Sequence, residues 1–72
     1  MAITPTHTKR LLKRPEVREK TSLSDSELYR QIAVGSFPRP IRLTPNGRAV
    51  AWLESEVDAW IESRLAEREE VA

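Results

Sequence analysis

The stretch SDSELYRQ, residues 24–31, gathers side chains that could recognise a hydrogen-bonding surface. Its four strongest candidates are Ser26, Tyr29, Arg30 and Gln31. An arginine forms paired hydrogen bonds with guanine, and a glutamine does the same with adenine. A tyrosine hydroxyl can bind a phosphate oxygen. By residue type, Arg30 is therefore the best candidate for a guanine contact, and Gln31 is the candidate for adenine if it faces a DNA groove.

The rest of the chain offers little for catalysis or metal binding. It has no cysteine, and its single histidine, His7, lies in a segment without apolar periodicity. A zinc site needs about four ligands, and a nucleophilic centre needs a positioned base. Glu54 and Asp58 are four residues apart and are interpreted as a solvated acidic helix face. We expect no catalytic residue, no metal site and no cofactor.

The polar stretch needs a helix to position it, and the sequence marks where that helix begins and ends. Ser24 and Glu27 form an S-x-x-E capping box, which satisfies free backbone donors in the first turn. Leu28 and Ile32, four apart, form an apolar face. The glycine that follows can adopt the left-handed conformation that ends a helix. The pattern predicts a helix over residues 25–34.

A shorter helix is predicted just before it. Pro15 suits the first helical position, and Glu16 is placed where the helix dipole favours an acid. This helix should last about two turns and end near Lys20 or Thr21. Only a few residues then separate the two helices, which is typical of a helix-turn-helix.

After the second helix the apolar residues alternate, which predicts a β-hairpin. The alternating positions are Ile41 and Leu43, then Val50 and Trp52. Between them, TPNG at residues 44–47 predicts a turn in which Asn-Gly supplies positive φ. Pro38 and Pro40 lack backbone donors, so the first strand should lie at a sheet edge.

A last helix is indicated by one apolar stripe: Val57, Trp60, Ile61 and Leu65. We expect its packed part to end at Leu65. The predicted organisation is a flexible arm over 1–10, a small α+β winged helix-turn-helix domain over 11–65 and a frayed tail over 66–72. The expected core comprises fourteen residues: Leu12, Val17, Leu23, Leu28, Ile32, Phe37, Ile41, Leu43, Val50, Trp52, Val57, Trp60, Ile61 and Leu65.

Charge is unevenly distributed although the net charge is only +1. Residues 1–52 hold ten Lys or Arg against four acids, and residues 53–72 hold two against seven. Such asymmetry favours a polyanion partner for the basic part, while ordinary surface charge stays an alternative. The absence of cysteine, of a secretory signal and of a long apolar run predicts a cytoplasmic protein without membrane contact.

Three stretches, read together, resemble a known family. RLLKRPEV, TSLSDSELYRQIAVGSFPRPIRL and AVAWLESEVDAWIESR are similar to the AlpA-type phage regulators and small excisionases, relatives of the DNA-binding domains of the MerR group. The resemblance covers about residues 10–64. It implies a winged helix-turn-helix of a mobile element that binds specific double-stranded DNA. Two tasks stay open: activating an integrase gene, or bending DNA for excision.

The same resemblance assigns roles to individual residues. It makes residues 25–34 the recognition helix and turns Ser26, Tyr29 and Arg30 toward DNA. Many relatives have a basic residue where this chain has Asp25, which would either repel phosphate or accept a hydrogen bond from cytosine. The basic residues around the hairpin and the first helix are expected to contact the DNA backbone or minor groove: Arg39, Arg42 and Arg48, then Lys13, Arg14 and Arg18.

Plainer interpretations stay open for these side chains. Ser26 could bond locally at the helix start, Tyr29 could pack against the wing, and the basic residues could be solvated. Trp52 and Trp60 are at core spacing, so base stacking is the lesser expectation for them. A second function also stays open, a protein-interaction module that binds an integrase or another regulator through its acidic last helix. We expect a monomer that assembles cooperatively on DNA.

Overall fold

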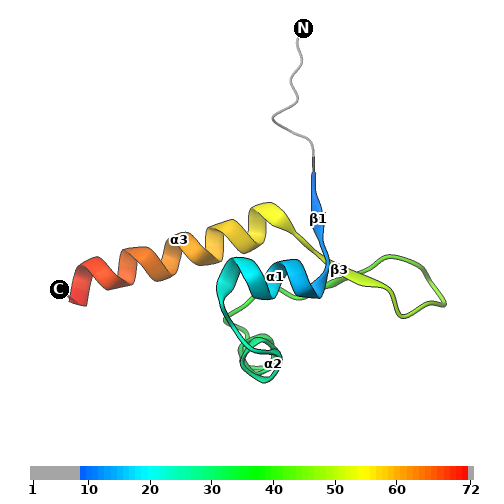
Figure 1. Cartoon of the computed structure of the whole chain (residues 1–72), viewed down its shortest axis with the longest axis horizontal. Coiled ribbons are helices and arrows are strands. Elements are labelled where there is room, and N and C mark those ends of the chain that lie inside the picture. Colours follow the sequence, from blue (N-terminus) through cyan, green and yellow to red (C-terminus); the bar gives the residue numbers. More distant parts are fainter. Residues whose placement is uncertain (1–8, 72) are drawn as a thin grey trace, which may run out of the picture.

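Figure 1 shows the computed structural model of the chain, which describes residues 9–71. Its elements in chain order are β1 (Leu11–Leu12), α1 (Arg14–Thr21), α2 (Asp25–Ala33), β2 (Ile41–Arg42), β3 (Val50–Leu53) and α3 (Glu54–Val71). The three strands form an antiparallel sheet in the order β1-β3-β2. This small α+β arrangement confirms the predicted fold class and is compatible with a winged helix-turn-helix.

The two short helices are separated by only residues 22–24, as the sequence predicted. At the start of α1 the Lys13 N–H donates to Glu16 Oε1 at 2.9 Å. At its end Ser22 has a φ of 64°, in the left-handed region, and its N–H donates to the Arg18 carbonyl at 2.7 Å. A serine pays a conformational penalty there that a glycine would not. The change of direction between the helices therefore occurs at a left-handed residue, Ser22.

The second helix has the predicted ends. The Glu27 N–H donates to Ser24 Oγ at 3.2 Å, and the Ser24 N–H donates to Glu27 Oε1 at 2.9 Å, so the capping box is complete. Gly35 has a φ of 84°, which confirms its predicted role at the helix end. Nine residues would not hold a helix in isolation. The caps and the contact with the core therefore keep α2 folded.

The hairpin forms, but its turn differs from the prediction. Among the described residues only Ser22 and Gly35 have positive φ, so Asn46 and Gly47 do not supply it. The connection is instead an open loop over residues 43–49, and the Leu43 N–H donates to the Ala49 carbonyl at 2.9 Å. A Cβ at position 47 would meet the Thr44 hydroxyl, so a larger residue there would require the Thr44 side chain to move. As predicted, β2 is an edge strand.

The register of the hairpin overturns part of the predicted core. Ile41 pairs with Ala51, and Arg42 pairs with Val50. Paired residues in an antiparallel sheet point to the same face, and neighbours along a strand point to opposite faces. Ile41 and Leu43 therefore lie on the face opposite Trp52 and are exposed, at 42% and 39%. Because a shift of one residue in register exchanges the two faces of a strand, alternation alone could not show which face Ile41 and Leu43 occupy.

The core lies between the sheet and the three helices. Its buried cluster consists of Leu12, Val17, Leu28, Phe37, Trp52 and Val57, and Leu23, Ile32, Val50, Trp60 and Ile61 pack against it half-buried. Trp52 is fully buried, and its Nε1–H donates to the Pro38 carbonyl at 3.1 Å. The rings of Phe37 and Trp60 meet edge to face, with centroids 5.0 Å apart. Both tryptophans thus belong to the core, as predicted.

Two features of the ends were not expected. Leu11 and Leu12 form β1, which pairs with Leu53 and Trp52 of β3. At the other end, α3 continues six residues beyond Leu65, and Leu65 itself is 42% exposed. The last side chains of α3 that pack against the core are Trp60 and Ile61. Leu65 therefore does not belong to the core, contrary to the sequence-based expectation.

These positions make opposite predictions for two leucines. Leu28→Ala should lower the free energy of unfolding by about 2–5 kcal/mol, because it leaves a cavity in the core. Leu65→Ala removes an exposed side chain and should change that free energy by less than about 0.5 kcal/mol. Urea unfolding followed by circular dichroism measures both. Equal losses for the two variants would contradict this description of the core.

Candidate nucleic-acid interface

The outward face of α2 carries the predicted hydrogen-bonding side chains. Leu28 is fully buried, whereas Ser26, Tyr29 and Arg30 are exposed, with Tyr29 at 44%. Burial of Leu28 fixes the rotation of the helix, since residues three and four apart share a face. In Figure 1, α2 lies at the lower edge of the molecule, seen along its axis. Arg30 is thus turned toward solvent and not toward the core.

Gln31 and Ser26 already have partners within the protein. Gln31 is half-buried, and its Oε1 accepts a short hydrogen bond from Ser36 Oγ. Reading adenine uses both the oxygen and the nitrogen of the amide. Gln31 would therefore have to release Ser36 before it could read adenine in this way. Ser26 Oγ lies 3.5 Å from Ser24 Oγ, which matches the local interpretation of this serine.

Asp25 has a role that the sequence did not indicate. Its Oδ1 lies 3.6 Å from Nε of Arg14 and 3.4 Å from Nε of Arg18. The two arginines are four residues apart on α1 and therefore share a face. The carboxylate at the start of α2 thus connects the two helices. The sequence alone suggested only that Asp25 would meet DNA. Its pairing with the arginines could not be predicted, because it depends on how α1 and α2 pack.

Tyr29 belongs to the same group of side chains. The Tyr29 side chain is the main cause that raises the pKa of Arg14, followed by the Asp25 carboxylate. Tyr29 therefore lies near Arg14 of α1. We call Arg14, Arg18, Asp25 and Tyr29 the inter-helix cluster.

The other predicted basic residues are exposed: Lys13, Arg30, Arg39, Arg42 and Arg48. Among the side chains of residues 9–68, none of these five takes part in an ion pair. Arg42 belongs to β2, and Arg48 belongs to the loop over residues 43–49. This loop projects at one end of the molecule in Figure 1, far from the end of α3. The hairpin thus carries cations that no described carboxylate neutralises.

Two acids near the start of α3, Glu54 and Asp58, are paired with cations. Lys20 Nζ lies 2.7 Å from Asp58 Oδ1 and 3.2 Å from Glu54 Oε2. Hydrogen bonds that Lys20 donates to Asp58 and then to Glu54 raise the pKa of Lys20. Arg10 also reaches Glu54, at 3.6 Å. The pair interpreted from sequence as a solvated face therefore clamps α1 to α3.

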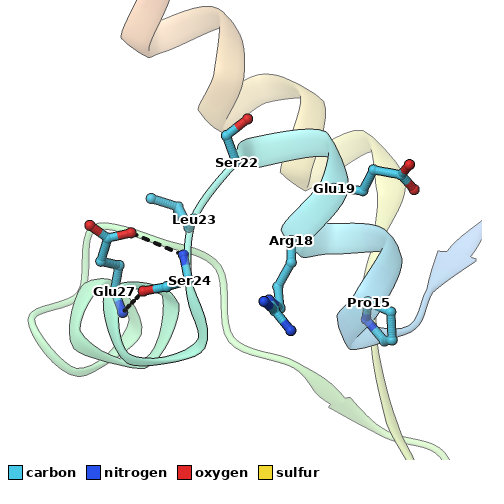
Figure 2. A pocket seen from close by; sticks show the side chains of 7 residues that line it. All are labelled: Pro15, Arg18, Glu19, Ser22, Leu23, Ser24 and Glu27. Carbon is cyan, nitrogen blue, oxygen red and sulfur yellow. Dashed lines mark hydrogen bonds between the residues drawn. The ribbon is translucent and has the colours of Figure 1, made fainter.

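An open hollow of about 510 Å³ lies between α1 and α2 (Figure 2). Its lining includes Pro15, Arg18, Glu19, Leu23 and Glu27. Backbone and side-chain hydrogen bonds from Ser24 lower the pKa of Glu27, whose carboxylate caps the helix. The hollow itself is a poor site for a free anion, because two carboxylates line it and its one arginine, Arg18, is paired with Asp25.

Comparison with known proteins places the chain in a family. Residues 10–65 match the family described as Prophage CP4-57 regulatory protein (AlpA). The chain belongs to this AlpA family. The match includes both short helices, the sheet and α3 as far as Leu65. The resemblance noted in the sequence is thereby confirmed, and the AlpA family is a regulatory one of phage origin.

One curated relative of this AlpA-family chain comes from Enterobacteria phage P4. It is called uncharacterized protein ORF88, and it is 46% identical over 59 residues. The match covers 82% of this chain and 65% of the relative, so the chain spans just under two thirds of that protein's length. No solved structure matches the chain. Within residues 9–71, no helix is long and apolar enough to cross a membrane.

The capping box of α2 gives a stability prediction. Ser24→Ala should lower the free energy of unfolding by about 1 kcal/mol, because the Glu27 N–H loses its acceptor. The depressed pKa of Glu27 means that its carboxylate stabilises the fold at neutral pH, and that this effect fades as pH falls below ~4. Thermal unfolding of wild type and Ser24→Ala between about pH 7 and 3 measures both effects. Ser26→Ala is the control and should stay within about 0.5 kcal/mol.

Proposed function

We propose that this AlpA-family chain binds specific double-stranded DNA by inserting α2 into the major groove. The observation that carries the proposal is the outward face of α2, where Tyr29 and Arg30 are exposed while Leu28 is buried. An α-helix with its side chains is about 10–12 Å across, and the major groove is about 12 Å wide. Arg30 is the residue proposed to read a guanine.

The remaining cations would hold the backbone on either side of α2. Lys13, Arg14 and Arg18 lie on or beside α1, and Arg39, Arg42 and Arg48 lie on or beside the hairpin. Backbone contacts fix the position of a protein on the duplex without reading its sequence. We propose that the loop over residues 43–49 follows a phosphate strand or enters the minor groove. The three cations beside α1 would bind the other side.

Regulation of a promoter and excision of a mobile element would use the same surface. The fold hosts both tasks, so the domain itself does not choose between them. Two properties of the complex separate them. An excision factor should occupy several neighbouring sites and bend the DNA. A bend slows the protein–DNA complex in a gel most strongly when the bound site lies at the centre of the DNA fragment. A promoter regulator should occupy a single site and alter transcription.

The far end of α3 supports a second candidate function. Glu62 and Glu67 are exposed, and the helix there extends beyond the last residues that pack against the core. Such a surface could bind a basic partner, and an integrase is the candidate. Reversing both charges to Lys should abolish capture of a purified integrase if this end is the site. Unchanged capture would leave only the DNA-binding proposal.

The decisive experiment selects bound sequences from a random pool of duplexes. Enrichment of one motif supports specific binding, and an unchanged pool contradicts it. Titration of the selected duplex by fluorescence anisotropy at several salt concentrations then measures the backbone contacts. With about five or six phosphates neutralised, log K should fall with log salt at a slope of about −5. A flat line would contradict the proposed interface.

Arg30 is expected to contribute specificity. Arg30→Ala should weaken binding to the selected duplex by about 1–3 kcal/mol and relax the preference at one base pair. The matched control is Arg64→Ala, because Arg64 lies on α3, away from α2. Arg64 pairs with Glu67, and its Cζ lies 5.8 Å from the Trp60 ring centroid. Competition with single-base variants of the duplex measures the preference. Retained discrimination at every position in Arg30→Ala would remove Arg30 from base reading.

A further inference from the structure

We propose that Asp25 is a positioning residue for phosphate binding, acting through Arg14 and Arg18. It would hold the two guanidinium groups next to the start of α2, ready for one DNA phosphate. This inference rests on the DNA-binding function proposed above. From its charge alone, Asp25 would be expected to weaken the binding of DNA. In this proposal it strengthens that binding.

One oxygen atom of Asp25 serves both arginines. Oδ1 lies 3.6 Å from Arg14 Nε and 3.4 Å from Arg18 Nε. It is shielded from solvent and has no hydrogen-bond partner among the described residues. A carboxylate oxygen removed from water is unfavourable unless opposite charges surround it. The two cations supply that compensation, so Asp25 and the arginines hold one another in place.

Without the carboxylate, the two cations would repel each other. Arg14 and Arg18 are four residues apart on one helix, where like charges destabilise the shared geometry. Asp25 lies between them as a common counterion. The side chains are therefore ordered before any ligand arrives.

The contacts with Asp25 leave the phosphate-binding part of each guanidinium available. Both ion pairs use Nε, whereas each guanidinium has five N–H donors in total. The paired terminal nitrogens match the geometry of phosphate oxygens. Both side chains are about half exposed, at 50% and 45%. Figure 2 shows the Arg18 side chain extending into the space between Pro15 of α1 and Ser24 before α2.

Two effects of opposite sign compete at Asp25. Repulsion between its carboxylate and a phosphate about one Debye length away changes the binding constant by less than about fivefold at physiological salt, for the effective dielectric constant of about 20 that applies near a protein surface. Ordering a free arginine on binding weakens the binding constant by about two- to tenfold for each side chain. The ordering effect acts on two arginines, so together it exceeds the repulsion. Asp25→Asn should therefore weaken DNA binding although it removes a negative charge.

The test measures anisotropy titrations of the selected duplex at about 150 mM salt, near the physiological value. Asp25→Asn should bind about five- to tenfold more weakly than wild type, and Asp25→Glu should recover most of the loss. In an Arg14→Gln/Arg18→Gln background, the same Asp25→Asn change should bind equally or up to about fivefold more tightly. The charge-matched control is Glu19→Gln in the wild-type background, which removes an acid from α1, the helix that carries both arginines. This variant should bind slightly more tightly than wild type.

The outcomes separate this inference from the function on which it rests. Tighter binding by Asp25→Asn in the wild-type background would overturn the positioning role and leave DNA binding intact. Equal losses in both backgrounds would also overturn it, because Asp25 would not act through the arginines. A wild type that binds no duplex would overturn the proposed function itself. Thermal unfolding of each variant, with Asp25→Ser as a second replacement, separates weak binding from loss of folding.

Discussion

Burial of Leu28 is the constraint on which the arrangement of the polar face depends. It is the one fully buried residue of α2, a helix of nine residues. Each residue of an α-helix is rotated by about 100° from its neighbour, so a change of one residue in the packing would turn Tyr29 inward. The leucine therefore determines which side chains a ligand would meet. Function at this surface is set by an apolar contact on the opposite side of the helix.

The helices and strands of this domain are short, so the burial of Leu28 depends on packing between segments that are distant in sequence. The longest strand has four residues, and α1 and α2 have eight and nine. None of these would be stable alone, and a domain of this size leaves a small margin of stability. The structure compensates with contacts between distant segments. Trp52 bonds to Pro38, Lys20 binds the start of α3, and Asp25 joins α2 to α1. Each ties two elements that meet only in the folded chain.

Local chemistry explains which parts of the structure were predictable from sequence. The capping box of Ser24 and Glu27 and the left-handed Gly35 depend on neighbours within four residues, and both were predicted correctly. Strand β1 was missed because two leucines in sequence carry no alternating pattern. Ile41 and Leu43 were misplaced because the pattern shows alternation but not register. The pairing of Asp25 with two arginines was missed because it depends on the angle between the helices.

The distribution of charge in space also explains how an acidic helix is compatible with the proposed DNA surface. Near the sheet, Glu54 and Asp58 of α3 are paired with Lys20 and Arg10. Most of the other acids of α3 lie beyond Ile61, along about 15 Å of helix that leads away from the hairpin in Figure 1. That length is nearly two Debye lengths at physiological salt, so repulsion from the far end is largely screened. The same separation gives the molecule a basic end and an acidic end, which would orient it as it approaches a polyanion.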